Sequence, residues 1–581
     1  MVYVKGTLDD RRNTRRNASY GGVLSESIMD IPFPMAVASR ILDSFGFSEI
    51  VDSMLDWDPK QCKISPSDAL KAIVLATASK GERPAIMNLP LHYQNIPLEL
   101  MFDTVRTPDD LDRFTVSDHL DHLYEAGPGR VYLNVCAAAR VHYEIVSRVV
   151  HSDTTSVSVW GTYESDYQND GGIDITRGYS KDKRPDLRQY MVGKAVDDNG
   201  ISLFSQPLDG NTSDVTWNEM CLDTIGDVIA REDLIYVADS KVVTKELVER
   251  VNEAGIRFVS RLPRGFDEKL QRKVLRLTEP GDLVKMRKLP SEVKRTDRWY
   301  VDHPMESCGT TLRLIPQVTD HSRGKGDKAL AKVRDSFERF LASFQTEYNC
   351  MKDAVDAFGK FQKKASKNHK MFRVQAEYEE FKTEKRGRGR PRKDGKGVIV
   401  EEKVHVVVTY TENPQVRDDI WKSEEFIVTI SNIPLPEDDP DRGMCAEDII
   451  RLYNSQWKVE GQFATMKKPA IADRLFLEKE SRAEALVTVF NIGVLIRGLI
   501  QLLMRRGIDR IGDEGLPPYG VDGGPLQRNV THAYFLQQFQ NYNIHYYPRA
   551  GEYVYPNRTV AERAGFFLDL MGIEPAGLFS G

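Results

Sequence analysis

At 581 residues the chain is too long for one hydrophobic core, and the usual size of a domain predicts three or four domains. The longest apolar stretch, 485–503, is broken by Asn491, Gly493 and Arg497, and no basic-then-apolar leader opens the chain, so we expect a cytoplasmic protein with neither membrane span nor signal peptide. Six scattered cysteines without close pairs argue against a disulfide framework or a zinc site.

The net charge of -6 conceals a strongly basic segment. Residues 360–396 contain 14 Lys and Arg against 5 Asp and Glu, so the remainder of the chain is distinctly acidic. A sequence pI of about 6.1 therefore does not exclude a polyanionic partner.

Residues 1–144 read as helical, and β-branched residues then predict a strand region at 145–160, with Asp153 inside it. Asn199-Gly200 between two apolar runs predicts a β-hairpin. A helix, a short buried strand that ends at Asp239, a helix and a strand are expected at 215–230, 234–239, 244–254 and 257–261. This order predicts an α/β fold with a mixed sheet covered by helices.

After Pro263 the regular alternation stops. We interpret 266–423 as an insertion that contains further strands and a helical pair running from 329 toward 381. Strand character returns at 403–411 and 424–433, and a buried helix is expected at 483–505.

Residues 451–468 are predicted to form one helix with a polar stripe. Tyr453, Gln456, Glu460 and Lys467 fall within about 60° of one another around such a helix, beside an apolar stripe that would face the core. The pattern fits a functional site and a solvated surface face equally well.

The basic segment contains Lys385-Arg-Gly-Arg-Gly-Arg-Pro-Arg-Lys393, which resembles an AT-hook. An extended Arg-Gly-Arg-Pro backbone can lie in a narrow A·T-rich minor groove, with Arg388 and Arg390 inserted. Arg386 and Arg392 are further candidate DNA contacts. A flexible basic linker is the alternative interpretation.

Three carboxylates distant in sequence, Asp153, Asp239 and Glu460, would converge if the first two lay on neighbouring strands and a helix crossed them. Hard oxygen ligands of this kind suit Mg²⁺ or Mn²⁺. Asp239 could instead be a helix-capping or turn residue, and Asp166, Asp170 and Asp174 are rivals of Asp153. The sequence offers neither a P-loop nor a defensible serine triad.

The chain resembles the DDE transposases of prokaryotic insertion sequences, in the group whose last acidic residue lies in a Tyr-x2-Arg-x3-Glu-x6-Lys signature. The matching residues are Tyr453, Gln456, Glu460 and Lys467, Asp153 in His-Ser-Asp-Thr-Thr, the block from Gly178 to Gln189, Gly210-Asn211 before Asp214, and Val237-Ala-Asp239-Ser. The resemblance covers about 150–505.

This resemblance implies an RNase H-like core interrupted by an insertion, with Asp153, Asp239 and Glu460 as catalytic ligands of Mg²⁺ or Mn²⁺. It implies hydrolysis at the ends of the element and attack of the freed 3′-OH on target DNA, with Tyr453, Gln456 and Lys467 contacting DNA. The partners would be double-stranded DNA, as terminal inverted repeats and target, and a second copy in a homodimeric synaptic complex; no membrane is involved, and the protein would be nucleoid-associated.

The expected segments follow from the residues and the resemblance together. They are a helical N-terminal domain with a possible role in binding DNA ends (1–144), the first part of the catalytic core (145–265), the α+β insertion (266–423), the second part of the core (424–506) and a C-terminal region (507–581).

The departure from the family pattern is Gln456, where arginine is expected. Glutamine donates a hydrogen bond but brings no positive charge. Two alternatives to an active transposase therefore stay open: an impaired or repurposed DNA-binding protein, and a nuclease that cuts without joining.

Overall fold

The computed structural model consists of two compact units. The first comprises residues 1–242, 250–258 and 454–581, and the second comprises 243–249 and 259–453. The structure describes residues 6–7, 28–79, 84–160, 171–226, 234–263, 265–288, 297–386, 398–467, 479–512, 530–539 and 542–579.

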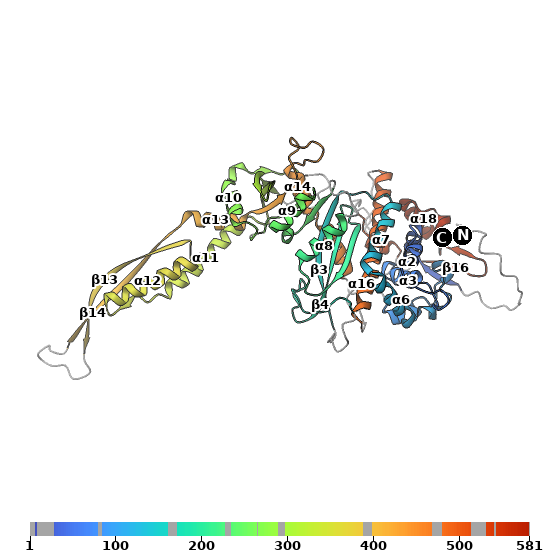
Figure 1. The fold of residues 1–581 in the computed structure, drawn as a ribbon, viewed down its shortest axis with the longest axis horizontal. Helices are drawn as coiled ribbons and strands as arrows, with labels where there is room; N and C mark the ends of the chain where they lie inside the picture. The colour runs from blue at the N-terminus through green and yellow to red at the C-terminus, as the bar shows by residue number, and fades with distance from the viewer. Residues whose placement is uncertain are drawn as a thin grey trace. The chain divides into compact units, whose positions relative to one another are not determined.

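Strand β3 (Val149–Val159) organises the sheet of the first unit (Figure 1). It pairs antiparallel with β4 (Arg188–Asp197), which pairs antiparallel with β5 (Ser202–Leu208), and it pairs parallel with β6 (Ile235–Ala238). The predicted β4–β5 hairpin is confirmed, with Gly200 in its turn at φ 78°, a conformation that glycine adopts without strain. The strands are almost wholly buried, as expected for a sheet covered on both faces.

Helices precede and follow these strands. α8 (Asp214–Gly226) and η5 (Ser240–Val242) flank β6, and α9 (Lys245–Glu253) and β7 (Arg257–Arg261) contain the boundaries between the units. The elements predicted at 215–230, 234–239, 244–254 and 257–261 are thus observed within a few residues, except that 227–230 lie outside the described residues.

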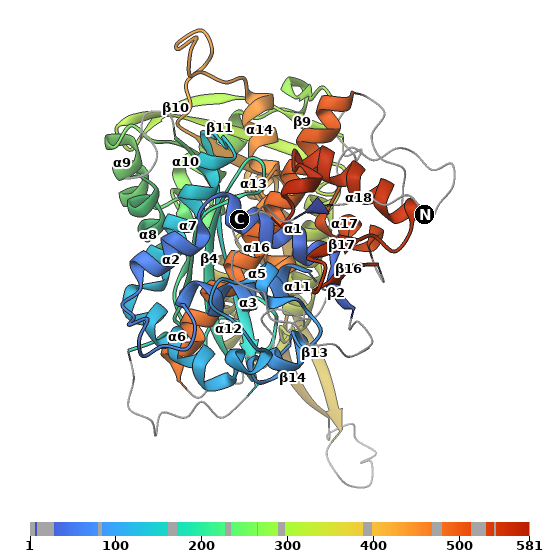
Figure 2. The ribbon, with the colours of Figure 1, turned by 90° about the vertical axis from the view of Figure 1, so that its right-hand side faces the viewer.

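The N-terminal helices pack around α16 (Glu480–Ile511), which lies in the middle of their shared hydrophobic core (Figure 2). α16 is long and apolar enough to cross a membrane, but 94% of its most apolar window is buried inside the protein, as in a core helix. The N-terminal helices are α1 (Phe33–Ser44), α2 (Phe47–Met54), α3 (Pro66–Ser79), η2 (Ile86–Asn88), α4 (Leu89–His92), α5 (Leu98–Met101), η3 (Pro108–Leu111), α6 (Arg113–Ala126) and α7 (Pro128–His142).

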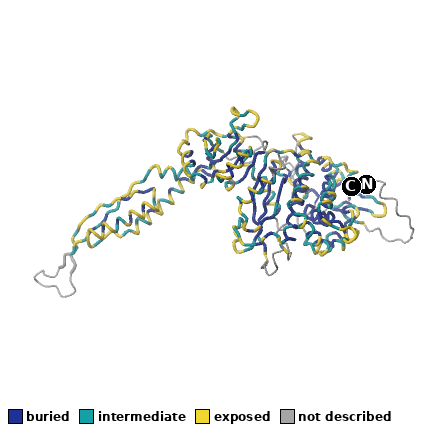
Figure 3. Tube along the Cα trace, viewed as in Figure 1, coloured by how far each residue is buried: buried dark blue, intermediate teal, exposed yellow. Residues whose placement is uncertain are grey.

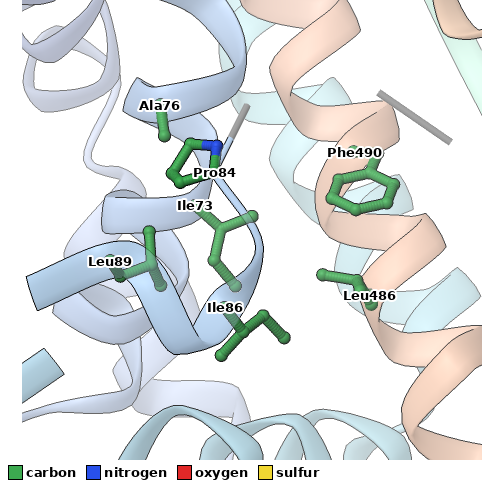
Figure 4. Close-up of a pocket in the computed structure, with 7 residues that line it drawn as sticks. All are labelled: Ile73, Ala76, Pro84, Ile86, Leu89, Leu486 and Phe490. Atoms are coloured by element: carbon green, nitrogen blue, oxygen red, sulfur yellow. The ribbon is translucent and has the colours of Figure 1, made fainter. Parts of the chain in front are cut away.

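A small apolar cavity lies between α3, the segment after it and α16 (Figure 4). Because its lining carries no polar side chain, we regard it as a packing gap. The lining residues are Ile73, Ala76, Pro84, Ile86, Leu89, Leu486 and Phe490.

The two ends of the chain share a second sheet in the order β1-β17-β16-β2. Ile31 near the N-terminus pairs with Ile544 near the C-terminus, so the first and last segments of the sequence fold together. The elements are β1 (Gly6–Thr7), β2 (Met29–Pro32), α17 (His532–Gln538), β16 (Asn543–Tyr547), β17 (Glu552–Val554), α18 (Arg558–Met571) and η7 (Pro575–Gly577).

In the second unit β11 (Thr310–Thr319) pairs antiparallel with β9, β10 and β15, β9 pairs antiparallel with β8, and β15 pairs antiparallel with β7. The other elements here are α10 (Glu268–Leu277), η6 (Pro280–Asp282), β8 (Val284–Lys285), β9 (Arg298–Tyr300), β10 (His303–Ser307), α13 (Pro414–Glu425), β15 (Ile427–Ser431) and α14 (Ala446–Asn454).

A long two-stranded ribbon, β13 (Phe372–Arg386) and β14 (Val398–Glu412), projects within this unit, with α11 (Lys325–Ala342) and α12 (Met351–Asn368) along one face and β12 (Glu347–Tyr348) at its edge. Figure 3 shows that one side of these helices is buried and the other exposed. The prediction of a helical pair reaching 381 is wrong beyond 368. Phe372, Val374 and Ala376 alternate toward the helices, and pairing with β14 outweighs the helix propensity of the Glu-rich sequence.

The helix predicted at 451–468 is divided into α14 and α15 (Trp457–Met466). Ser455 and Gln456 form a turn between them, and Lys458 N–H bonds three residues back to the Ser455 carbonyl. The Ser455 hydroxyl lies 3.2 Å from Nε2 of His151. Asparagine and serine are weak helix formers whose side chains compete with helical hydrogen bonds, which is the physical reason for the interruption.

Candidate active site

Asp153 and Asp239 lie at neighbouring positions on two parallel strands. Ser152 of β3 is in register with Ala238, the last residue of β6, so Asp153 on β3 and Asp239 directly after β6 come next in the two segments. The carboxyl end of β6 is where a parallel sheet presents functional side chains. The predicted placement of both carboxylates on neighbouring strands is therefore observed.

A loop before β4 brings a lysine to Asp153. Nζ of Lys181 lies 3.4 Å from Oδ1 of Asp153 and donates to the carbonyl and hydroxyl oxygens of Thr154 at 2.7 and 2.8 Å. The backbone N–H of Lys181 is held by the Ser156 hydroxyl at 2.9 Å. The lysine is thus fixed by β3 at both its backbone and its side chain.

Two glycines allow this loop to approach the sheet. A Cβ on Gly178 would lie 2.2 Å from the Gly210 carbonyl oxygen, and a Cβ on Gly210 would lie 2.1 Å from that of Gln189. Any larger residue at either position would push the loop outward. These contacts give the Gly178–Gln189 block and Gly210 a structural purpose: they position Lys181.

A third carboxylate, Asp214 at the start of α8, completes the cluster. Its Oδ1 lies 3.1 Å from Nζ of Lys181 and its Oδ2 lies 2.8 Å from Nζ of Lys241, and the Thr154 hydroxyl donates to it. Lys241 also donates its backbone N–H to Oδ1 of Asp239 at 3.0 Å. Three carboxylates and two ammonium groups therefore share one small region.

The environment separates the pKa values of these acids. Burial raises the pKa of Asp153 to about 6, against the opposing effect of Lys181, and burial also raises the pKa of Asp239. Burial acts in the same direction on Asp214, but hydrogen bonds from Lys241 and Thr154 outweigh it, so that its pKa is lowered. Asp153 and Asp239 are thus the carboxylates whose negative charge most needs a cation.

The raised pKa of Asp153 predicts a pH-dependent gain of stability in Asp153→Asn. Between its ordinary pKa of 3.8 and about 6, the unfolded chain ionises first and binds fewer protons than the folded protein, so the wild type loses stability as pH rises. We expect the metal-free variant to unfold at a higher urea concentration than wild type above pH 6. The advantage is about 1–3 kcal/mol, discounted because the Asp153 side chain is 28% exposed.

Urea unfolding in EDTA at pH 4 and pH 7.5 measures this advantage. Asp198→Asn, at an exposed turn, is the control and gains nothing at either pH. An Asp153→Asn advantage that is equally large at pH 4 would contradict the assignment, since pH 4 is close to the ordinary pKa of 3.8 and only a small part of the advantage has developed there.

A buried tryptophan fixes α8, the helix that carries Asp214, against the sheet. Trp217 of α8 is wholly buried, stacks on Phe204 with ring centroids 5.5 Å apart, and donates from Nε1 to the Ser152 hydroxyl at 2.9 Å. A Cβ on Gly193 would lie 2.2 Å from the indole. Glycine on β4 therefore leaves the space that lets α8 lie close to β3 and carry Asp214 to the cluster.

Glu460 lies in the first turn of α15, which packs on β3 and β4 through Val459 and Phe463. The Glu460 side chain is exposed, and the structure does not bring it into contact with Asp153 or Asp239 in the described part of the chain. Gln462 anchors the helix by donating to the Gly200 carbonyl at 2.7 Å.

The other residues of the signature have different surroundings. Lys467 forms an ion pair with Asp182, the residue after Lys181. Gln456 is half-buried, and its Nε2 has no hydrogen-bond partner among the described residues. Tyr453, on α14, is half-buried and belongs to the second unit. Arg386 ends β13, whereas Arg388, Arg390 and Arg392 lie outside the described residues.

The chemistry of the cluster fits a divalent cation, although no three His, Cys, Asp or Glu side chains in the described residues are arranged to hold a metal ion. Asp153 and Asp239 supply hard oxygen donors, and the two ammonium groups beside them show that the site attracts positive charge. These two aspartates would hold the ion.

No role for Lys181, Lys241 or Asp214 was predicted from the sequence. Lys181 and Asp214 fall in or beside motifs that were recognised, but which of their polar residues turn inward depends on packing around Gly178 and Gly193. A lysine two residues after the strand-ending Asp239 was the one local signal for Lys241.

Comparison with protein families agrees with this geometry. Residues 148–492 match the transposase DDE domain, and residues 30–137 match a domain of unknown function (DUF4277). No curated protein matches the chain. The transposase match spans more than half of the sequence and contains Asp153, Asp239 and Glu460. The chain therefore belongs to the DDE transposase family.

Proposed function

We propose that this transposase cleaves DNA at the ends of an insertion sequence and joins the freed 3′-OH ends to target DNA. The observation that carries the proposal is the placement of Asp153 and Asp239 at neighbouring positions of parallel strands within the family-matched segment. Two divalent ions, when bound, would supply activation of the attacking oxygen and stabilisation of the leaving oxygen.

The residues of the chain would hold and orient these groups. Asp153 and Asp239 bind the cation, and Glu460 joins them as third ligand once α15 and DNA are engaged. Lys181 keeps the Asp153 carboxylate and the Thr154 backbone in place. Tyr453, Gln456 and Lys467 provide hydroxyl, amide and ammonium donors for phosphates near the cut. Two copies would act together on two element ends.

The test is a duplex carrying the element's terminal repeats, incubated with the full-length protein and Mg²⁺ or Mn²⁺ and then with a target plasmid. We expect nicking at the repeat ends followed by joined products. Binding without nicking in either metal would refute the proposed activity, and nicking without joining would reduce it to a nuclease.

A second candidate function is a DNA-binding protein derived from a transposase. It is favoured by Gln456, which replaces the arginine of the family pattern and leaves its buried Nε2 without a partner among the described residues. Gln456→Arg distinguishes the two functions: restored cleavage in an otherwise silent protein identifies an impaired enzyme.

We further propose that the AT-hook-like segment contacts A·T-rich minor grooves through Arg388 and Arg390. Arg390→Ala is expected to weaken binding to A·T-rich duplexes several-fold more than binding to G·C-rich ones, because the guanidinium gains most from the negative potential of a narrow groove. Competition binding with matched 30-bp duplexes measures this. Equal losses on both would leave only a basic linker.

A further inference from the structure

The C-terminal half of α12 carries a stripe of exposed lysines. Residues 360–370 contain five lysines and no Asp or Glu, and Lys360, Lys363, Lys364 and Lys367, here called the lysine stripe, are all exposed. At about 100° per residue these four lie within roughly 100° of the helix circumference. Phe358, Phe361 and Ala365 face the other way, into the cluster under the ribbon.

Acids on the same face of α12 stand only before the stripe, at Asp353 and Asp356. None of the four ammonium groups of the stripe has an ion-pair partner within 4.0 Å in the described ranges of the chain, whereas Arg334 on α11 is paired with Glu412. Lysines at i,i+3 and i,i+4 repel each other by about 0.2–0.5 kcal/mol per pair. Repulsion among the lysines therefore destabilises α12, and binding of a polyanion would reduce this repulsion.

The helix dipole does not account for the stripe. Cations are favoured near a helix C-terminus, but the effect is confined to about the last turn. α12 ends at Asn368, so Lys360 and Lys363 lie more than one turn away from its end. A general need for solubility does not explain why residues 360–370 contain no acid while Glu377 and Glu379 occur on the outer face of β13.

We propose that the lysine stripe of α12 is a binding site for the phosphate backbone of duplex DNA, separate from the carboxylate cluster and from the AT-hook-like segment. The inference rests on the proposed function for its choice of polyanion. From Lys360 to Lys367 the helix rises about 10 Å. The phosphates of one DNA strand are spaced about 3.4 Å apart along the duplex axis, so this rise corresponds to about three nucleotides. The site reads no sequence, because it offers point charges to phosphates.

The experiment compares Lys363→Gln/Lys367→Gln with Lys328→Gln/Lys332→Gln in the full chain. Both pairs are exposed, are spaced i,i+4 and lie on 18-residue helices of the same unit, but the control pair has Asp327 and Asp335 beside it. Binding of a repeat-free 30-bp duplex is measured between 50 and 300 mM salt by fluorescence anisotropy.

We expect the stripe variant to lose about tenfold or more in affinity at 0.1 M salt, with a salt dependence shallower by about two, since each lost phosphate contact removes about 0.9 from the slope. Its thermal midpoint without DNA should be unchanged or higher, because repulsion is relieved. The control should bind as wild type. Equal effects of both pairs, or no change in slope, would overturn the inference.

Two further outcomes separate this inference from the proposed function. If the wild type does not cleave DNA but the stripe variant still binds DNA more weakly than the wild type, only the transposition chemistry is refuted. Unchanged DNA binding by the stripe variant, together with lost binding to an acidic polypeptide such as polyglutamate, would assign the stripe to a protein partner and overturn the DNA assignment.

Discussion

Asp239→Asn is expected to abolish DNA cleavage while leaving DNA binding largely intact. Asparagine keeps the oxygen that accepts the Lys241 backbone N–H at 3.0 Å, so the turn after β6 is preserved. It removes the negative charge that would hold a divalent cation beside Asp153. Because a metal ion contributes several kcal/mol of transition-state stabilisation, the rate should fall by about a thousandfold or more.

Single-turnover nicking of a repeat-bearing duplex measures this loss, with anisotropy as the binding readout. Asp198→Asn is the matched control: it makes the same chemical change at an exposed turn, and cleavage should remain at the wild-type rate. Wild-type nicking by Asp239→Asn would show that the carboxylate is a turn residue and that the active centre lies elsewhere.

Trp217→Ala should be among the most destabilising single substitutions in the first unit. It empties a wholly buried site, removes the stacking on Phe204 and leaves the buried Ser152 hydroxyl without its indole donor. Such truncations cost about 3–5 kcal/mol. Because α8 carries Asp214, cleavage should also fall even at temperatures where the protein stays folded.

Urea unfolding gives the free energy, and Trp160→Ala, at a tryptophan 59% exposed, controls for loss of the residue type and should cost less than about 1 kcal/mol. Gly193→Ala provides a sharper test. It should destabilise the wild type by about 1–3 kcal/mol through overpacking, but cost little in Trp217→Ala, where the clash is absent. Equal costs in both backgrounds would contradict the packing.

The elements that sequence reasoning predicted correctly have strong local signals. Asn199-Gly200 predicts a turn by itself, and the short apolar run before Asp239 predicts a buried strand. The prediction of a helical pair from 329 toward 381 wrongly places the first part of β13 in a helix. The partner of this strand is β14, which begins only at Val398, and a strand of this composition forms only through that non-local pairing.

The candidate site was predictable to the extent that strand order places side chains. Asp153 and Asp239 come together through register alone. Lys181 and Asp214 reach them only because a loop packs against glycines and a helix packs through Trp217, which are contacts that no local pattern reports. The prediction of a single helix through Tyr453 and Lys467 is wrong at Ser455. The hydroxyl of Ser455 lies within hydrogen-bond distance of His151 on β3, which is distant in sequence. The role of Glu460 stays a prediction.

The pairing of β2 with β16 has a consequence for synthesis on the ribosome. Ile31 pairs with Ile544, and the early helices bury their apolar faces against α16, so the first unit completes its core only after these later segments have been synthesised. The ribbon and its two helices close their own cluster from residues 330–421 alone. Translation that stops before residue 530 would therefore yield a folded ribbon with its two helices and an incompletely folded first unit. That unit would depend on chaperones and be sensitive to proteases, and the product would be inactive.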